Sequence, residues 1–488
     1  MAPHNTLPPE IQVFILERLM EPDERSNGSK YHRSICAGVC KGWQQIIERR
    51  TFRHLTLQPS DITKFSRLAD PSRRGHIKHI LLEIPVKSSS GMWPYNPVPT
   101  HEENNAVFTR AVQHLWEVLS TWRGHHITLE IGIYSSFETM AYNDGCENSR
   151  KAYSKFLEYG PSGVALPDLH LVQLKCFQDP PSDISALDIW NWRNWSLLGH
   201  DSLAFDDGKL LDDSDQDARH FILPEAEVIT HLLIRRRYFR NISAKSLSRI
   251  LKAAPCLETI HLERWCYGRR HQDTVWDMNS AFIGHELPPS LKQFSFYEEF
   301  STDYHQRPRK MRSRRSNLKL LEAMAKSTHH LEHVSISFAL DARNFFLPSL
   351  QLNGDSLITI SLTSNILLSR SNDMVNELLE RAAQPAKKMP KLKILELWHC
   401  KTGEAGIFRY EKFDRFGSVT WQGTWTFTLS ETVRQAWEEG FVDSDRELFG
   451  LGVSVINLPP GEITSVRSVF PYLKLKKYIL HDVSWTQV

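Results

Sequence analysis

The chain has 488 residues, more than a single hydrophobic core usually organises, so several domains or a repeat array are expected. Its 41% hydrophobic and 24% charged residues are typical of a folded protein, and 59 basic against 57 acidic residues create no overall field that favours nucleic acid or an anionic membrane. We find no apolar run of about 18 residues and no signal-peptide pattern. Seven scattered cysteines fit reduced thiols, so we expect a cytoplasmic and/or nuclear protein with no membrane partner.

A helix with two apolar faces is predicted near the N-terminus. Pro8 and Pro9 suit its first turn, where a missing N–H costs nothing. One face holds Ile11, Phe14, Ile15 and Leu19, and the second holds Val13, Leu16 and Met20. A segment of about 45 residues buries too little surface to cover both faces, so an external partner should cover one of them.

The next apolar pattern predicts further helix and then an extended exit. Helical spacing relates Ile35, Val39, Trp43, Ile46 and Ile47, and alternation follows at Phe52, Leu55 and Leu57. The ordered set LPPEI, I-L-x-x-L, V-C-K-x-W and F-R-x-L-x-L resembles the F-box family. The link from Met20 to Ser34 is longer than is usual in that family, which leaves the start of the second helix open.

The resemblance implies a small three-helix F-box domain over residues 1–57 that packs against a Skp-type subunit of cullin-based ubiquitin ligases. Carried onto this sequence, it gives as candidate Skp contacts Leu7, Pro8, Ile11, Ile15, Leu19, Val39, Cys40 and Trp43. The alternative is that these apolar residues merely form an internal three-helix core.

A second pattern, apolar-x-x-apolar-x-apolar, recurs through the body. It starts at Phe52, Ile77, Leu169, Ile229, Leu257, Leu291, Leu331, Leu357 and Leu392. Chance alone would produce on the order of a dozen matches, but a proline lies two residues before four of these starts, at 167, 255, 289 and 390. Each proline should end the preceding element and lead into a strand.

Helical patterns precede several of these motifs. Leu247, Ile250, Leu251 and Ala254 share one face, and the same arrangement is formed by Val375, Leu378, Leu379 and Ala382. Stacked helix–strand units predict an α/β fold over residues 58–400, an irregular leucine-rich-repeat-like solenoid with a parallel sheet. A curved, non-catalytic binding surface should follow. The alternative is an ordinary α/β domain with coincidental strands.

The C-terminal region, residues 401–488, is richer in strand patterns. Val419 and Trp421, then Trp425, Phe427 and Leu429, alternate around Gln422-Gly423, which predicts a hairpin, with a helix from Ser430. This region should form a strand-rich cap over the open end of the repeats. Together with the N-terminal motifs it resembles fungal F-box proteins of unassigned substrate.

Three insertions are predicted to be exposed loops, near residues 86–103, 199–219 and 303–316. The third holds a basic run from Arg307 to Arg315, which fits either a nuclear-import signal or a solvated loop. The acidic second loop fails as a calcium site, because Ala218 and Pro224 replace the glycine and the closing glutamate. Cys36 and Cys40 lack further ligands nearby and are expected to be buried thiols.

No catalytic motif for nucleophilic, phosphate-binding or dinucleotide chemistry occurs, so we expect neither an enzyme nor a cofactor or metal. The leading hypothesis is a substrate receptor of a Skp-cullin-F-box ubiquitin ligase, which binds an unknown target protein through the repeat body. One alternative is a scaffold, Skp-bound or free, without a role in ubiquitination. Another is an enzyme with an unrecognised pocket.

Overall fold

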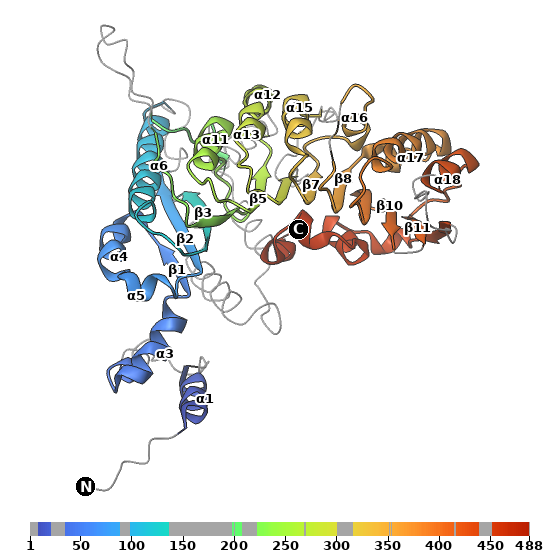
Figure 1. Ribbon diagram of the computed structural model, residues 1–488. Helices are drawn as coiled ribbons and strands as arrows, with labels where there is room; N and C mark the ends of the chain where they lie inside the picture. The colour runs from blue at the N-terminus through green and yellow to red at the C-terminus, as the bar shows by residue number, and fades with distance from the viewer. Residues whose placement is uncertain are drawn as a thin grey trace, which may run out of the picture.

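The computed structural model has an α/β fold built on one sheet of 12 strands, which lie side by side in the order of the sequence (Figure 1). It describes residues 8–20, 35–87, 98–135, 198–199, 201–206, 222–267, 270–299, 316–350, 352, 354–413, 416–438 and 451–487. The strands are β1 (His54–Leu57), β2 (His79–Val86), β3 (Ile127–Ser135), β4 (Ile229–Ile234), β5 (Thr259–Trp265), β6 (Gln293–Glu299), β7 (His333–Ser337), β8 (Thr359–Thr363), β9 (Ile394–Lys401), β10 (Glu404–Lys412), β11 (Gly417–Gly423) and β12 (Leu451–Asn457).

The predicted parallel sheet is confirmed for most of its width. Each strand from β1 to β8 pairs in parallel with the next one. The pairs β9–β10 and β10–β11 are antiparallel, and β12 returns to a parallel pairing with β11. The predicted domain boundary at residue 57 therefore falls at the end of β1, the first strand of this sheet.

Helices cover one face of the sheet, and two more project from its first strand (Figure 1). The projecting pair is α1 (Pro9–Met20) and α3 (Lys41–Thr51). The others are α4 (Ile62–Leu68), α5 (Pro71–Arg74), α6 (Val98–Leu119), α11 (Ala244–Lys252), α12 (Arg270–Asn279), α13 (Ala281–His285), α15 (Leu318–Ser327), α16 (Ala342–Phe345), α17 (Asn372–Ala386) and α18 (Glu431–Glu438). A last helix, α19 (Lys476–Ile479), lies on the opposite face of the sheet (Figure 1). No helix among the described residues is both long and apolar enough to span a bilayer.

The repeated sequence motif corresponds to a repeated turn. Leu257, Leu291, Leu357 and Leu392 each donate their N–H to the carbonyl three residues earlier, and each side chain is at most 1% exposed. The strand begins two residues after each of these leucines. A buried leucine thus anchors the turn that leads into each strand, and a proline lies two residues before it in three of the four turns, at 255, 289 and 390. The motif at Leu169 lies outside the described residues.

The helix-side core agrees with the sequence patterns. All four apolar residues predicted on one face of α11, and the corresponding four on α17, are at most 5% exposed. Val334 and Ile336 of β7 lie in the same continuous cluster, at 1% and 0% exposure. Alternate strand residues therefore point towards the helices, as the period of a strand requires.

The strands β3, β10 and β12 were not predicted individually, and one expectation about strands was wrong. The predicted hairpin around Gln422-Gly423 does not form, because both residues lie inside β11, which pairs with β10 on one side and β12 on the other. Trp425 and Phe427 pack against Trp421 without forming a strand. The helix predicted from Ser430 is confirmed as α18, with the Ser430 hydroxyl accepting from the Val433 N–H.

The chain ends in a segment that lies across the face of the sheet opposite the helices (Figure 1). We call residues 458–487 the C-terminal strap. It contains the 3-10 helices η5 (Pro460–Glu462), η6 (Val466–Tyr472) and η7 (Asp482–Gln487), together with α19. Its buried side chains form a second small core with strand residues such as Tyr297, Trp398 and Ile407. The strap therefore runs back from the last strands towards the first ones.

Candidate docking surface and buried polar clusters

The helices α1 and α3 form a small pair whose own core holds few residues. Leu16 and Ile47 are buried against each other, at 0% and 3% exposure, with Trp43 and Ile46 partly buried beside them. Hydrophobic contact over so small an area leaves most of the apolar surface of the pair uncovered. The prediction that α1 has one covered and one uncovered apolar face is confirmed by Leu16 and Ile11.

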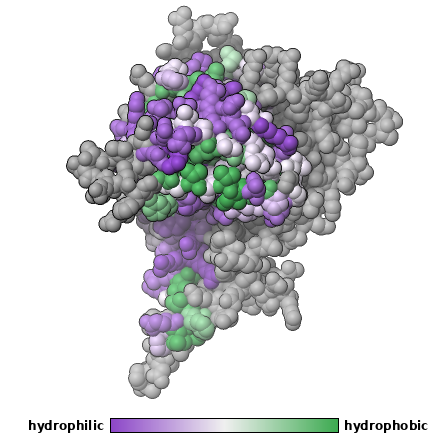
Figure 2. Space-filling view, turned by 90° about the vertical axis from the view of Figure 1, so that its right-hand side faces the viewer, coloured by the Kyte–Doolittle hydropathy of each residue, from purple (hydrophilic) through white to green (hydrophobic). Residues whose placement is uncertain are grey.

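Four large apolar side chains remain exposed on this pair of helices and on residues 35–40, which precede α3. Their exposed fractions are 45% for Ile11, 57% for Phe14, 67% for Ile35 and 60% for Val39. We call these four residues the N-terminal apolar surface. Figure 2 shows apolar surface on the narrow part that projects below the body. Several large exposed apolar side chains on one small unit of a soluble protein are typical of an interaction site.

The structure places the predicted Skp contacts in three groups. Pro8, Ile11, Val39 and Cys40 are exposed, and Ile15 and Trp43 are half-buried. Leu7 and the Leu19 side chain lie outside the described residues. Phe14 and Ile35 were not among the predicted contacts, although helical spacing placed both of them on the relevant faces. The expectation of a buried Cys40 was wrong, because it precedes α3 at the surface, and Cys36 is only half-buried.

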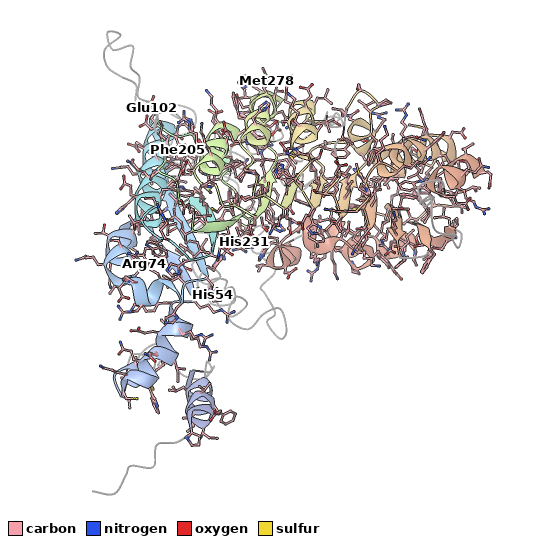
Figure 3. All side chains as sticks on the ribbon, viewed as in Figure 1. His54, Arg74, Glu102, Phe205, His231 and Met278 are labelled. Carbon is pink, nitrogen blue, oxygen red and sulfur yellow. The ribbon has the colours of Figure 1, made fainter. Side chains whose placement is uncertain are left out.

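An ion pair joins the projecting helices to the body. Glu48 of α3 receives two hydrogen bonds from the guanidinium of Arg73 in α5, at 2.8 and 3.2 Å, and Arg73 also lies over the ring of Phe52. The bond from Arg73 lowers the pKa of Glu48. Nearby, His54 of β1 lies at the end of the sheet from which the helices project (Figure 3), and burial lowers its pKa to about 4.

The sheet face opposite the helices is covered in part by the strap. The strap covers it from β9 back to β5, since Glu396 of β9 accepts backbone hydrogen bonds from Lys474 and Leu475 at 3.0 and 3.1 Å. Glu263 of β5 accepts bonds from the His481 N–H at 2.9 Å and the Ser484 hydroxyl at 2.5 Å. Both carboxylates are buried, and burial raises the pKa of each.

A larger buried ionic cluster continues from Glu263 towards β2. The Arg235 guanidinium donates to Glu130 at 2.6 Å, with both side chains fully buried, and His79 lies 3.1 Å from the other oxygen of Glu130. Tyr238 donates to Glu83 at 2.9 Å, and burial raises the pKa of its hydroxyl. A Cβ on Gly132 would lie 2.2 Å from the Tyr238 ring, so only glycine admits this ring over β3.

Two histidines lie where the strap meets this cluster. The rings of His261 in β5 and His481 in the strap are 6.2 Å apart, edge to face. Burial is the main cause that lowers the pKa of His261 to about 4 and that of His481 to about 3. Both rings are therefore neutral near neutral pH, and the strap contact depends on their remaining so.

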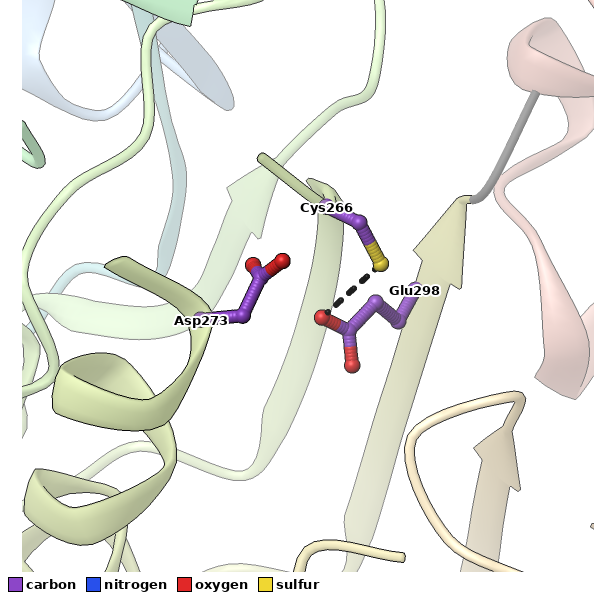
Figure 4. A group of neighbouring side chains, drawn as sticks. All are labelled: Cys266, Asp273 and Glu298. Carbon is purple, nitrogen blue, oxygen red and sulfur yellow. Dashed lines mark hydrogen bonds between the residues drawn. The ribbon is translucent and has the colours of Figure 1, made fainter. Parts of the chain in front are cut away.

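Among the described residues, Cys266, Asp273 and Glu298 form a group whose ligand atoms lie within 4.8 Å of one another (Figure 4). Their geometry would allow a cation, but the guanidinium of Arg264 already bonds to both carboxylates, at 2.5 Å to Glu298 and 3.0 Å to Asp273. Arg264 also stacks on Trp276 at 4.1 Å. The guanidinium of Arg264 therefore supplies the positive charge that balances these two carboxylates. The arrangement is explained as an ion-pair network within the chain.

Two cavities deserve comparison with these clusters. One, of about 670 Å³, lies beside α6 and is lined by residues such as Val86, Asn104 and Tyr134. The other, of about 260 Å³, lies between α11 and α12 and is lined by Phe205 and Trp276 among others. His261, His481 and the buried glutamates line neither cavity. These two cavities are thus separate from the histidines and glutamates whose pKa values are shifted.

The structure describes only parts of the three predicted loops. Residues 98–103, within the predicted loop 86–103, begin α6, and Val86 ends β2, so only its middle lies outside the described residues. The acidic residues Asp213, Asp215 and Asp217 and the whole basic run 307–315 also lie outside them. Their predicted roles stay predictions.

Comparison with known families gives one match. A model described as Family of unknown function (DUF6546) matches residues 286–481. This stretch includes the strands from β6 to β12 and most of the strap, and it excludes the projecting helices. No curated protein matches the chain.

Proposed function

We propose that this protein is a substrate-recognition adaptor of a Skp-cullin-F-box ubiquitin ligase, which binds a Skp-type subunit through the N-terminal apolar surface. The observation that supports it is the exposure of Ile11, Phe14, Ile35 and Val39 on a small helical unit that projects from the body. The sequence motifs that resemble the F-box occur on the same unit. Catalysis would take place on other subunits, and this chain would hold a target near them.

The energetics favour a partner on this surface. Fully burying a Val, Ile or Phe side chain contributes about 1.5–3 kcal/mol, so four half-exposed chains have several kcal/mol available for binding. The Glu48–Arg73 ion pair and the contact of Phe52 with Arg73 orient the helices relative to the sheet. A bound partner would therefore be held in a defined position relative to the body.

The body would bind the target as a leucine-rich-repeat-like array. Support comes from the strands in chain order and from the turn that recurs before β5, β6, β8 and β9. In such an array each unit is stabilised chiefly by its neighbours, which suits an extended surface. Since the strap covers one face of the sheet, the target would contact other surfaces.

The experiment that tests the proposal is capture of a purified Skp-type subunit by the full chain and by the double variant Ile11→Asp, Val39→Asp. Both side chains are largely exposed, so the fold should tolerate the change, whereas a charge in a desolvated interface costs several kcal/mol. We expect capture to fall at least about 100-fold.

The matched control is Gln45→Asp, which adds a charge on the exposed side of α3 and should leave capture unchanged. Thermal unfolding followed by circular dichroism shows whether each variant stays folded. Undiminished capture by a folded double variant would refute the F-box proposal. Co-purification of cullin with the parent chain separates an adaptor from a scaffold that binds Skp but does not promote ubiquitination.

A further inference from the structure

The last strand of the sheet, β12, presents an apolar edge. Its outer side pairs with no strand among the described residues, and Val453, Val455 and Ile456 are 42%, 45% and 43% exposed. Leu451 at its start is 9% exposed and belongs to the helix-side core, so the strand is anchored at one end. Figure 2 looks onto this end of the body and shows apolar surface in the middle of it. An exposed strand edge is a template for pairing with another strand.

Along β12 the backbone N–H and C=O groups alternate between the side of β11 and the outer side of the sheet. The N–H of Leu458 donates to the carbonyl of Gly423 in the β11 direction. Because successive residues of a strand point their N–H and C=O groups to opposite sides, Ser454 and Ile456 also face β11. The N–H and C=O groups of Val453 and Val455 then face outwards, where a further strand would receive them.

We propose that β12 is a self-association edge, at which two copies of this chain pair antiparallel and extend the two sheets into one. The strand Leu451–Asn457 carries no charged side chain, so pairing with its own copy opposes no like charges. A strand that selects a different, charged partner would be expected to carry complementary charges. The occupant that fits this edge is therefore a second copy.

A two-fold axis between the copies, together with the outward-facing groups of Val453 and Val455, determines which residues of the two β12 strands lie opposite each other. A two-fold axis beside Ser454 places Val453 opposite Val455 of the second copy, as pairs that exchange hydrogen bonds, and Ser454 opposite Ser454 as a non-hydrogen-bonded pair. The β-branched valines then lie side by side across the junction, an arrangement that stabilises sheets. The seven-residue strand spans only about 23 Å, so we expect a reversible dimer that forms in the micromolar range.

Sedimentation velocity of the full chain between about 1 and 100 μM tests this proposal. We expect the parent to shift from monomer to dimer, and Val455→Pro to stay monomeric, because proline removes an outward N–H without touching the bonds to β11. Val453→Lys should weaken the dimer, since it removes the packing of Val453 against Val455 of the second copy and places the two lysines diagonally across the junction. Val455→Thr keeps the N–H and the branched shape and should dimerise like the parent.

Cross-linking tests the register. With the exposed Cys40 and Cys256 replaced by serine, Ser454→Cys should form an intermolecular disulfide under mild oxidation, because Cα atoms of a non-hydrogen-bonded pair lie about 4.5 Å apart. Val455→Cys on the same background should not, since its opposite residue is Val453. A parent that stays monomeric at 100 μM, or a dimer that survives both Val455→Pro and Val453→Lys, would overturn the proposal. Neither outcome affects the Skp-binding proposal, which concerns the other end of the chain.

Discussion

The contact between His261 and His481 predicts that acid weakens the attachment of the strap. Gln293 donates its amide N–H to Nε2 of His261 at 2.7 Å, and the Val483 N–H donates to Nδ1 of His481 at 3.4 Å. Both ring nitrogens act as acceptors, so each ring must be neutral. A proton on either nitrogen removes that bond and places a positive charge near Arg235 and the other ring.

The size of the effect follows from the pKa of His481, which is 6.5 in an unfolded chain and about 3 in the folded protein. Since the folded pKa is the lower one, the contribution to stability is complete above pH 6.5 and is lost as the pH falls towards 3. At pH 5 the loss is about 2 kcal/mol, because the pH lies about 1.5 units below the unfolded pKa and each unit corresponds to about 1.4 kcal/mol. His261, with a pKa of about 4, loses a similar amount.

The perturbation is His481→Asn, which cannot take up a proton but offers an oxygen to the Val483 N–H two residues on. The free energy of unfolding is measured with urea at pH 7 and at pH 5, and the loss between the two pH values is compared. We expect this loss to be about 2 kcal/mol smaller in the variant than in the parent. Glu263 and Glu396, whose raised pKa values act in the opposite direction, are present in both proteins and cancel in the comparison. Replacement of the exposed His285 by asparagine is the control. Equal losses in the parent and His481→Asn would refute the assignment of a neutral, buried His481.

Three further predictions concern other parts of the chain. Val334→Asp with Ile336→Asp should abolish the cooperative thermal transition of the body seen by circular dichroism, because two unpaired charges buried in β7 cost several kcal/mol each. Phe470→Ala should lower the free energy of unfolding in urea by about 3–5 kcal/mol, whereas Arg467→Ala, on the exposed side of the same 3-10 helix, should change it by less than about 0.5 kcal/mol. If the basic run is an import signal, replacing Lys310, Arg312, Arg314 and Arg315 by alanine should move a fluorescent fusion out of the nucleus, and an unchanged distribution would favour a solvated loop.

The sequence was informative where local spacing and burial coincide. The turn leucines and the one-sided apolar faces of α11 and α17 are produced by contacts between neighbouring elements, so their pattern appears in a short window. β3 was not predicted because it lacks this turn motif. Whereas β5, β6, β8 and β9 each begin two residues after a buried leucine, β3 begins two residues after His125, and the buried residue in its preceding turn is Trp122. The alternating Ile127, Leu129 and Ile131 were the signal that remained.

The strap and the polar clusters could not be predicted in this way. The strap consists of short 3-10 segments with no sustained period, and its contacts are remote in sequence, as between His481 and Glu263. Glutamates that alternate with apolar residues in β2, β3 and β5 look like the solvent side of a half-buried strand. Only the arrival of the strap, Arg235 and Tyr238 turns that side into a buried, hydrogen-bonded layer. The predicted hairpin is absent for a similar reason. Trp425 donates to the Leu367 carbonyl, so the alternating residues after Gly423 serve packing against a remote part of the chain and not strand pairing.

The strap changes where a target would bind under the proposed adaptor function. An open repeat array would offer the inner face of its sheet to a target. Here that face holds buried carboxylates, and their oxygens already accept hydrogen bonds from N–H groups of the strap. Displacing the strap would leave Glu263 and Glu396 without those donors, which costs several kcal/mol for each buried charge. Besides the N-terminal apolar surface and the edge of β12, an apolar and uncovered surface among the described residues lies on the helix layer. There Val275, Met278 and Phe282 are 45%, 66% and 44% exposed along α12 and α13, with Met278 on the outer side, away from the sheet (Figure 3). Target contact through the helix layer leaves the strap in place, so binding at that layer does not carry this cost.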